Sequence, residues 1–127
     1  MRKLAYFLRT LALPGVVLAM IVAAMTAPAA AHAIIVSAVP AAGATVSGPE
    51  IDLAFTFNVR IDTARSKLTL TGPDGGVRDI PILPNDSPAV LASRLSALAP
   101  GSYSVRWQVL ATDGHITRGD VKFTVAP

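Results

Sequence analysis

Strict alternation of apolar and polar residues is the pattern that most constrains the fold of this chain. In residues 50–57 the apolar side chains occupy every second position, and residues 103–109 and 121–125 repeat the pattern. A period of two places alternate side chains on opposite faces of an extended strand. The alternation therefore predicts strands that have one face on a hydrophobic core and the other in water.

Four weaker strands are predicted from shorter apolar runs, at residues 34–38, 67–71, 77–82 and 89–95. Segments rich in glycine and proline separate the strands, as turns require. Seven short strands in so short a domain predict an all-β fold, a small Greek-key sandwich or barrel of immunoglobulin-like kind. Such a fold does not by itself indicate a function.

Residues 1–31 differ in composition from the rest of the chain. A basic start is followed by an apolar run over residues 11–25, and Ala29 and Ala31 occupy the positions of a small-residue cleavage site. This order is typical of a secretion signal that is removed on export. It predicts cleavage after Ala31 and one periplasmic or otherwise extracytoplasmic domain, residues 32–127.

Two alternatives for this segment stay open. Residues 11–31 carry no charge and are long enough to cross a bilayer, so a membrane anchor is one of them, although the alanine-rich end fits a cleavage region better. Cleavage after Ala33 is the other, because Ala31 and Ala33 also satisfy the small-residue rule. That cut would remove His32 from the exported protein.

Charge and cysteine content exclude several classes of function. Three of the eleven basic residues lie in residues 1–31, so the remaining eight equal the eight acidic residues of the predicted domain. A neutral domain gives no indication of nucleic-acid binding. The chain has no cysteine, which excludes disulfides, thiolate metal sites and a catalytic thiol.

The chain has two histidines, and both stand where a metal could use them. After cleavage His32 would offer its free amine and its Nδ1 as a chelating pair. His115 follows Asp113 by two positions, and Gly114 between them lets the backbone bend so that both side chains converge. Three nitrogens and one oxygen suit a single Cu(II) ion better than other divalent metals.

These features resemble the CopC family of periplasmic copper-resistance proteins. The matching stretches are residues 32–43, 51–58, 98–107 and 113–115. The resemblance implies a cupredoxin-like β-fold and a Cu(II) site made of His32, Asp113 and His115. It also implies a CopD-like membrane transporter as a partner.

The chain departs from the family pattern in two places. Some members hold Cu(I) in a methionine-rich segment, whereas Met1, Met20 and Met25 all lie in the predicted signal. Some members also place a glutamate beside the copper, where this sequence has Phe57. A thioether Cu(I) site is therefore not expected in residues 32–127.

We expect a monomeric Cu(II)-binding protein that buffers copper or transfers it to a membrane partner, and not an enzyme. One alternative is a histidine-brace oxidase or monooxygenase, which also uses an N-terminal histidine. Asp113 argues against that activity, because a bound carboxylate would occupy the position that oxygen needs. The other alternative is a metal-free β-sandwich interaction module, in which His32 has no role.

Overall fold

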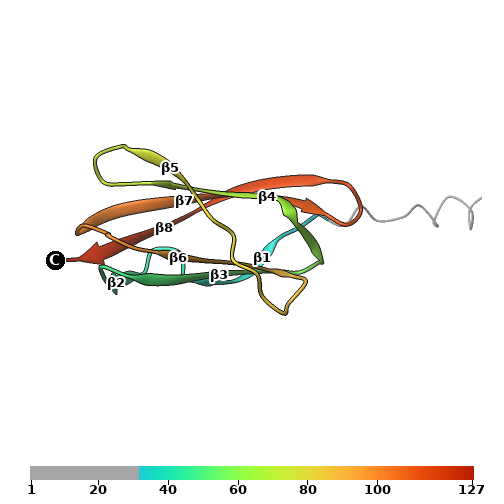
Figure 1. Cartoon of the computed structure of the whole chain (residues 1–127), viewed down its shortest axis with the longest axis horizontal. Coiled ribbons are helices and arrows are strands. Elements are labelled where there is room, and N and C mark those ends of the chain that lie inside the picture. The colour runs from blue at the N-terminus through green and yellow to red at the C-terminus, as the bar shows by residue number, and fades with distance from the viewer. Residues whose placement is uncertain (1–31) are drawn as a thin grey trace, which may run out of the picture. The chain divides into compact units, whose positions relative to one another are not determined.

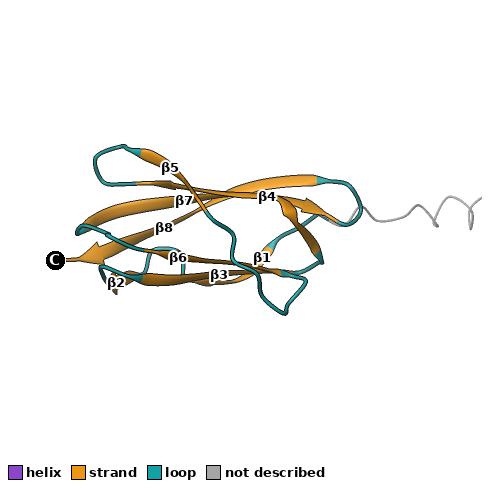
Figure 2. Ribbon diagram, in the orientation of Figure 1, coloured by secondary structure: helices purple, strands orange, loops and turns teal. Residues whose placement is uncertain are grey.

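All three alternating segments form strands in the computed structural model, which describes residues 32–127. The predicted signal, residues 1–31, lies outside the described residues. Eight strands and no helix occur between residues 32 and 127 (Figure 2), so this part of the chain contains no helix that could cross a membrane. In chain order the strands are β1 (Ile35–Val39), β2 (Thr45–Ser47), β3 (Ile51–Phe57), β4 (Ile61–Thr71), β5 (Val77–Ile80), β6 (Val90–Leu95), β7 (Gly101–Ala111) and β8 (Ile116–Ala126).

The strands form two sheets that face each other (Figure 1). One sheet has the order β1-β3-β6, and the other has the order β2-β8-β7-β4-β5. Neighbouring strands are antiparallel, except that β2 pairs with β8 in parallel. The predicted all-β class is confirmed, and of the two predicted forms the protein adopts the sandwich and not a closed barrel.

Strands β2, β4 and β8 differ from the sequence prediction, and β8 begins at Ile116, five residues before the predicted segment 121–125. The short strand β2 was not predicted, because three residues are too few to show a period. Strand β4 begins at Ile61, six residues before the predicted start, and its pairing with β7 shifts register between Asp62 and Lys67. This irregularity interrupts the alternation and hides the first half of the strand.

The apolar residues of the alternating segments are buried in the structure. Of the apolar side chains of β3, Leu53, Phe55 and Phe57 are at most 3% exposed. Tyr103 and Trp107 of β7 are buried core residues, as predicted. Aromatic packing links the two sheets, because the Phe57 and Trp107 rings meet edge to face with centroids 5.1 Å apart.

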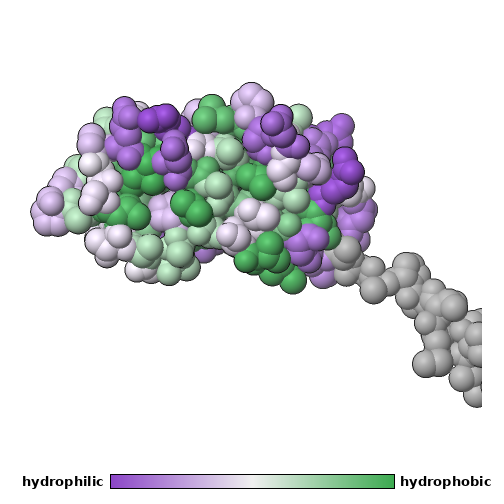
Figure 3. Space-filling model, turned by 90° about the horizontal axis from the view of Figure 1, so that it is seen from below, coloured by the Kyte–Doolittle hydropathy of each residue, from purple (hydrophilic) through white to green (hydrophobic). Residues whose placement is uncertain are grey.

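Polar side chains cover the outer faces of the sheets. On the larger sheet Arg106 donates to both carboxylate oxygens of Asp120 on the neighbouring strand, and Arg118 donates to Gln108. On the smaller sheet Arg94 reaches Glu50. The surface in Figure 3 accordingly mixes hydrophilic and hydrophobic residues.

The β7–β8 hairpin runs the length of the sandwich, with a register from Gly101↔Val125 to Leu110↔Ile116. Its turn, residues 112–115, lies at one end of the sandwich (Figure 1). The His32 ring lies 5.6 Å from the His115 ring, between centroids, and we call this the histidine end. The β4–β5 turn, residues 72–76, and the approach to β7, residues 97–103, lie at the opposite end. We call that the tyrosine end after Tyr103.

Candidate metal centre

The turn between β7 and β8 is held by its own backbone. The Ala111 N–H donates to the His115 carbonyl at 2.9 Å, and the Gly114 N–H donates to the Ala111 carbonyl at 2.9 Å. Gly114 has a φ of 92°, a left-handed conformation that favours glycine. The bend predicted at Gly114 is therefore present, and it directs the side chains on either side of it toward each other.

Asp113 and His115 meet across this turn. Oδ1 of Asp113 accepts a hydrogen bond from the His115 backbone N–H at 3.0 Å, and Oδ2 lies 3.1 Å from His115 Nδ1. The backbone hydrogen bond, followed by the side-chain one, lowers the pKa of Asp113 from its ordinary value. A carboxylate that faces Nδ1 fixes the orientation of the imidazole and leaves Nε2 free as a donor atom.

His32 reaches the same end of the sandwich because Asn58 holds the start of the described chain. The Asn58 side chain donates to the His32 carbonyl at 3.3 Å and accepts from the Ile34 N–H at 2.8 Å. The Asn58 backbone N–H also donates to the Ile34 carbonyl at 3.0 Å. As a result the His32 and His115 rings lie edge to face, with centroids 5.6 Å apart.

The three side chains do not yet form a closed ligand set. Among residues 32–127 no group of three His, Cys, Asp or Glu side chains already lies close enough to hold a metal ion. In the full chain the nitrogen of His32 is an amide bonded to Ala31, and an amide is a poorer ligand than a free amine. The structure thus brings two of the predicted ligands, Asp113 and His115, into contact and places the third beside them.

Comparison with known proteins identifies the family of this chain. The family model for the CopC domain matches residues 35–126. The chain belongs to the CopC family. Protein YobA of Escherichia coli K12 is 32% identical over 98 residues, which cover 75% of this chain and 79% of that protein. Copper resistance protein C of Escherichia coli is 32% identical over 105 residues, covering 76% and 83%.

A solved structure shows the same fold. The crystal structure of CopC from Methylosinus trichosporium OB3b superposes with a TM-score of 0.70 at 31% identity, covering 76% of this chain and 95% of that one. The resemblance to the CopC family noted from the sequence is therefore confirmed.

Apolar residues lie beneath the histidine end of this CopC-family protein. Phe57, at the position where some family members carry a glutamate, is 3% exposed and packs on Trp107. It follows that β3 contributes no carboxylate from that position.

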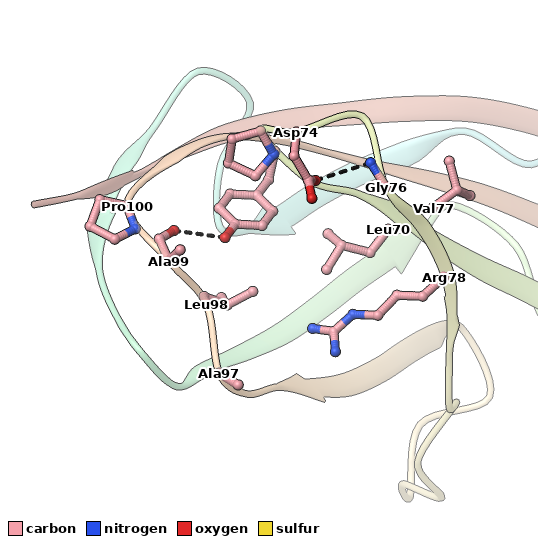
Figure 4. Close-up of a pocket in the computed structure, with 12 residues that line it drawn as sticks. Leu70, Asp74, Gly76, Val77, Arg78, Ala97, Leu98, Ala99 and Pro100 are labelled. Atoms are coloured by element: carbon pink, nitrogen blue, oxygen red, sulfur yellow. Dashed lines mark hydrogen bonds between the residues drawn. The ribbon is translucent and has the colours of Figure 1, made fainter.

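A separate cavity of about 520 Å³ lies at the tyrosine end (Figure 4). No histidine lines it, and its polar side chains are bonded within the chain. Tyr103 donates to the Ala99 carbonyl at 2.6 Å, Arg78 donates to the Ser96 carbonyl at 3.2 Å, and Asp74 accepts from the Gly76 N–H at 3.0 Å. These groups stabilise turns and leave few free donors for a metal.

Sequence reasoning missed Asn58, whose side chain fastens the segment that carries His32. Asn58 directly follows the alternating β3 segment, where an asparagine reads as an ordinary turn residue. Only the pairing of β1 with β3 shows that its amide faces the backbone of residues 32–34.

Proposed function

We propose that this protein binds one Cu(II) ion outside the cytoplasm through the His32 amine and imidazole, Asp113 and His115. The observation that carries the proposal is that the rings of the chain's two histidines lie with centroids 5.6 Å apart. The Asp113 carboxylate lies beside them and already contacts His115. Relatives that are named for copper resistance support copper as the metal.

The donor atoms favour Cu(II) over Cu(I). Imidazole, amine and carboxylate groups suit Cu(II), which binds most strongly among the divalent first-row metals, whereas Cu(I) prefers thiolates and thioethers. The chain has no cysteine, and its methionines are Met1, Met20 and Met25, all in the predicted signal. Residues 32–127 therefore contain no sulfur ligand for Cu(I).

Asp113 is able to serve as a ligand without releasing His115. A carboxylate offers about four lone-pair sites on its two oxygens, and the contacts with His115 use only part of them. An aspartate is ionised near neutral pH, which is the state that a cation requires, and the lowered pKa of Asp113 extends this state to lower pH. We therefore assign to Asp113 both the orientation of the His115 ring and an oxygen donor for copper.

The exposed position of the site fits buffering and transfer of copper. The His115 side chain is 53% exposed, and its neighbour Ile116 is also 53% exposed. Ile34, two residues after His32, is 60% exposed. An open site beside aliphatic side chains allows a partner to approach the ion directly, and by resemblance to the family we propose a CopD-like membrane transporter as that partner.

Removal of the leader is the step that would create the proposed site. The sharpest test compares the protein beginning at His32 with a matched form beginning at Ala31, which keeps every side chain but turns the His32 amine into an amide. We expect calorimetry to show one Cu(II) per chain for the first form and at least about 100-fold weaker binding for the second. Equal affinities of the two forms would rule out the His32 amine as a ligand, and equal uptake by a His32→Ala variant would favour the metal-free interaction module.

Two further measurements complete the test. Intact-mass analysis of the exported protein should give a chain that begins at His32, whereas a start at Ile34 would remove the proposed ligand. Copper occupancy should fall as pH drops below neutrality, because amine and imidazole nitrogens must lose protons before they bind a metal.

The alternative of a histidine-brace enzyme has its own readout. The copper-loaded protein should form little hydrogen peroxide from ascorbate and oxygen, because the proposed equatorial donors leave little open coordination. Rapid peroxide formation that stops in a His115→Ala control, which removes one histidine of the brace, would establish the enzyme instead.

A further inference from the structure

One buried hydroxyl at the histidine end lacks the hydrogen bond that such groups normally make. Thr117 Oγ1 is the one buried side-chain nitrogen or oxygen atom without a hydrogen-bond partner among residues 32–127. Other buried hydroxyls of the domain are satisfied, since Ser66 donates to the Asp62 carbonyl and Ser93 to the Pro81 carbonyl, each at 2.6 Å. A buried polar atom without a partner therefore calls for a specific explanation.

The strand register places this hydroxyl under the proposed site. Thr117 pairs with Val109. Two residues nearer the turn on each strand, the Ala111 N–H donates to the His115 carbonyl. Val109 and Ala111 are at most 3% exposed, so the side chain of Thr117 shares the core-facing side of the hairpin with them. His115, two residues earlier, follows the same alternation, which separates the two residues by about 6.6 Å along the strand.

Packing does not explain a threonine at this position. Valine has nearly the same shape, favours strands equally well and would add no polar atom opposite the buried Val109. The hydroxyl costs stability as long as it has no partner. An acceptor that arrives with a ligand would offset that cost.

We propose that Thr117 is a positioning residue of the copper site, whose hydroxyl donates a hydrogen bond to an oxygen atom of the loaded site. This proposal rests on the proposed function, and it adds a residue that neither the histidine pair nor Asp113 implies. Because the hydroxyl has no partner among residues 32–127 of this structure, a hydrogen bond that forms only when the metal binds stabilises the loaded protein more than the metal-free one.

The experiment compares Thr117→Val with Thr117→Ser in protein that begins at His32. Valine should weaken Cu(II) binding by about three- to tenfold, the effect of one hydrogen bond, and should shift the copper EPR spectrum. Serine keeps the donor and should restore both values toward those of the wild type. The metal-free valine variant should melt at the same temperature as the wild type or higher, because the unsatisfied hydroxyl is gone.

Thr124→Val is the matched control, since it removes a hydroxyl from the same strand near its far end. It should change neither the affinity nor the EPR spectrum. If Thr117→Val binds copper with wild-type affinity and an unchanged spectrum, the inference is wrong while the proposed function stands. If the wild-type protein fails to bind copper, both are wrong.

Discussion

Polar side chains lie at both ends of the sandwich, but they are hydrogen-bonded within the chain to different extents. At the tyrosine end Tyr103, Arg78 and Asp74 bond to backbone groups of the same chain. At the histidine end two imidazoles lie edge to face without a hydrogen bond between them, and the Thr117 hydroxyl has no partner within residues 32–127. The polar side chains of the tyrosine-end cavity are thus satisfied within the chain, whereas the histidine end keeps donor atoms free for the proposed metal.

Both ends depend on the same hairpin for their geometry. Strand β7 begins at the tyrosine end, where the ring of Tyr103 stacks on Phe123 of β8 with centroids 5.5 Å apart. The same two strands then carry the turn that holds Asp113 and His115. This shared scaffold makes the comparison testable, because substitutions at either end can be read against each other in one protein.

The largest expected effect is on copper affinity, which a substitution at the histidine end should lower and one at the tyrosine end should not. His115→Ala should weaken Cu(II) binding by at least about 100-fold. Loss of a residue that only orients a metal ligand already weakens affinity by about 10- to 100-fold, and His115 is a proposed ligand itself. Arg78→Ala, the matched change at the tyrosine end, should leave the affinity unchanged. Calorimetry on both variants checks the contrast, and an equal loss in the two would remove the distinction between the ends.

A smaller effect should appear in stability alone. Tyr103→Phe removes the hydrogen bond from the tyrosine hydroxyl to the Ala99 carbonyl and leaves that carbonyl without this donor. We expect a loss of about 1 kcal/mol in the free energy of unfolding, measured with urea, and no change in copper affinity. Weaker copper binding in this variant would show that the two ends are coupled.

The smallest effect concerns the sheet surface between the ends. The bond from Arg106 lowers the pKa of Asp120, so the folded state favours the carboxylate. The contribution of this ion pair to the stability of the folded state is complete above the ordinary pKa of aspartate. It is lost as pH falls through the lowered pKa of Asp120. Arg106→Gln should therefore lower the urea midpoint slightly at pH 7 and hardly at all near pH 2, because the pair is exposed. An equal shift at both pH values would rule out a charge effect.

The fold could be predicted from the sequence wherever alternation was unbroken. Strands β3 and β7 follow their pattern closely, because one face of each lies on the core. The first half of β4 could not be predicted, because a register shift disturbs its alternation. Strand β2 could not be predicted either, since its three residues gain their order from pairing with β8.

The site was only partly visible in the sequence. His32, Asp113 and His115 stood out because the chain has two histidines and because of their positions. Asn58 and Thr117 did not, because an asparagine after a strand and a threonine within one are ordinary residues. Their interest comes from what surrounds them, and a linear pattern does not record those surroundings.

The amino-acid sequence alone determined the strand pattern and the donor chemistry of this protein, because side-chain period and functional groups are local properties. Only the tertiary structure decided that His32 and His115 meet. It did so through the pairing of β1 with β3 and the return of β8 along β7, which bring together segments far apart in the chain. It also decided which polar atoms find partners, because a hydrogen bond depends on distances that exist only after folding.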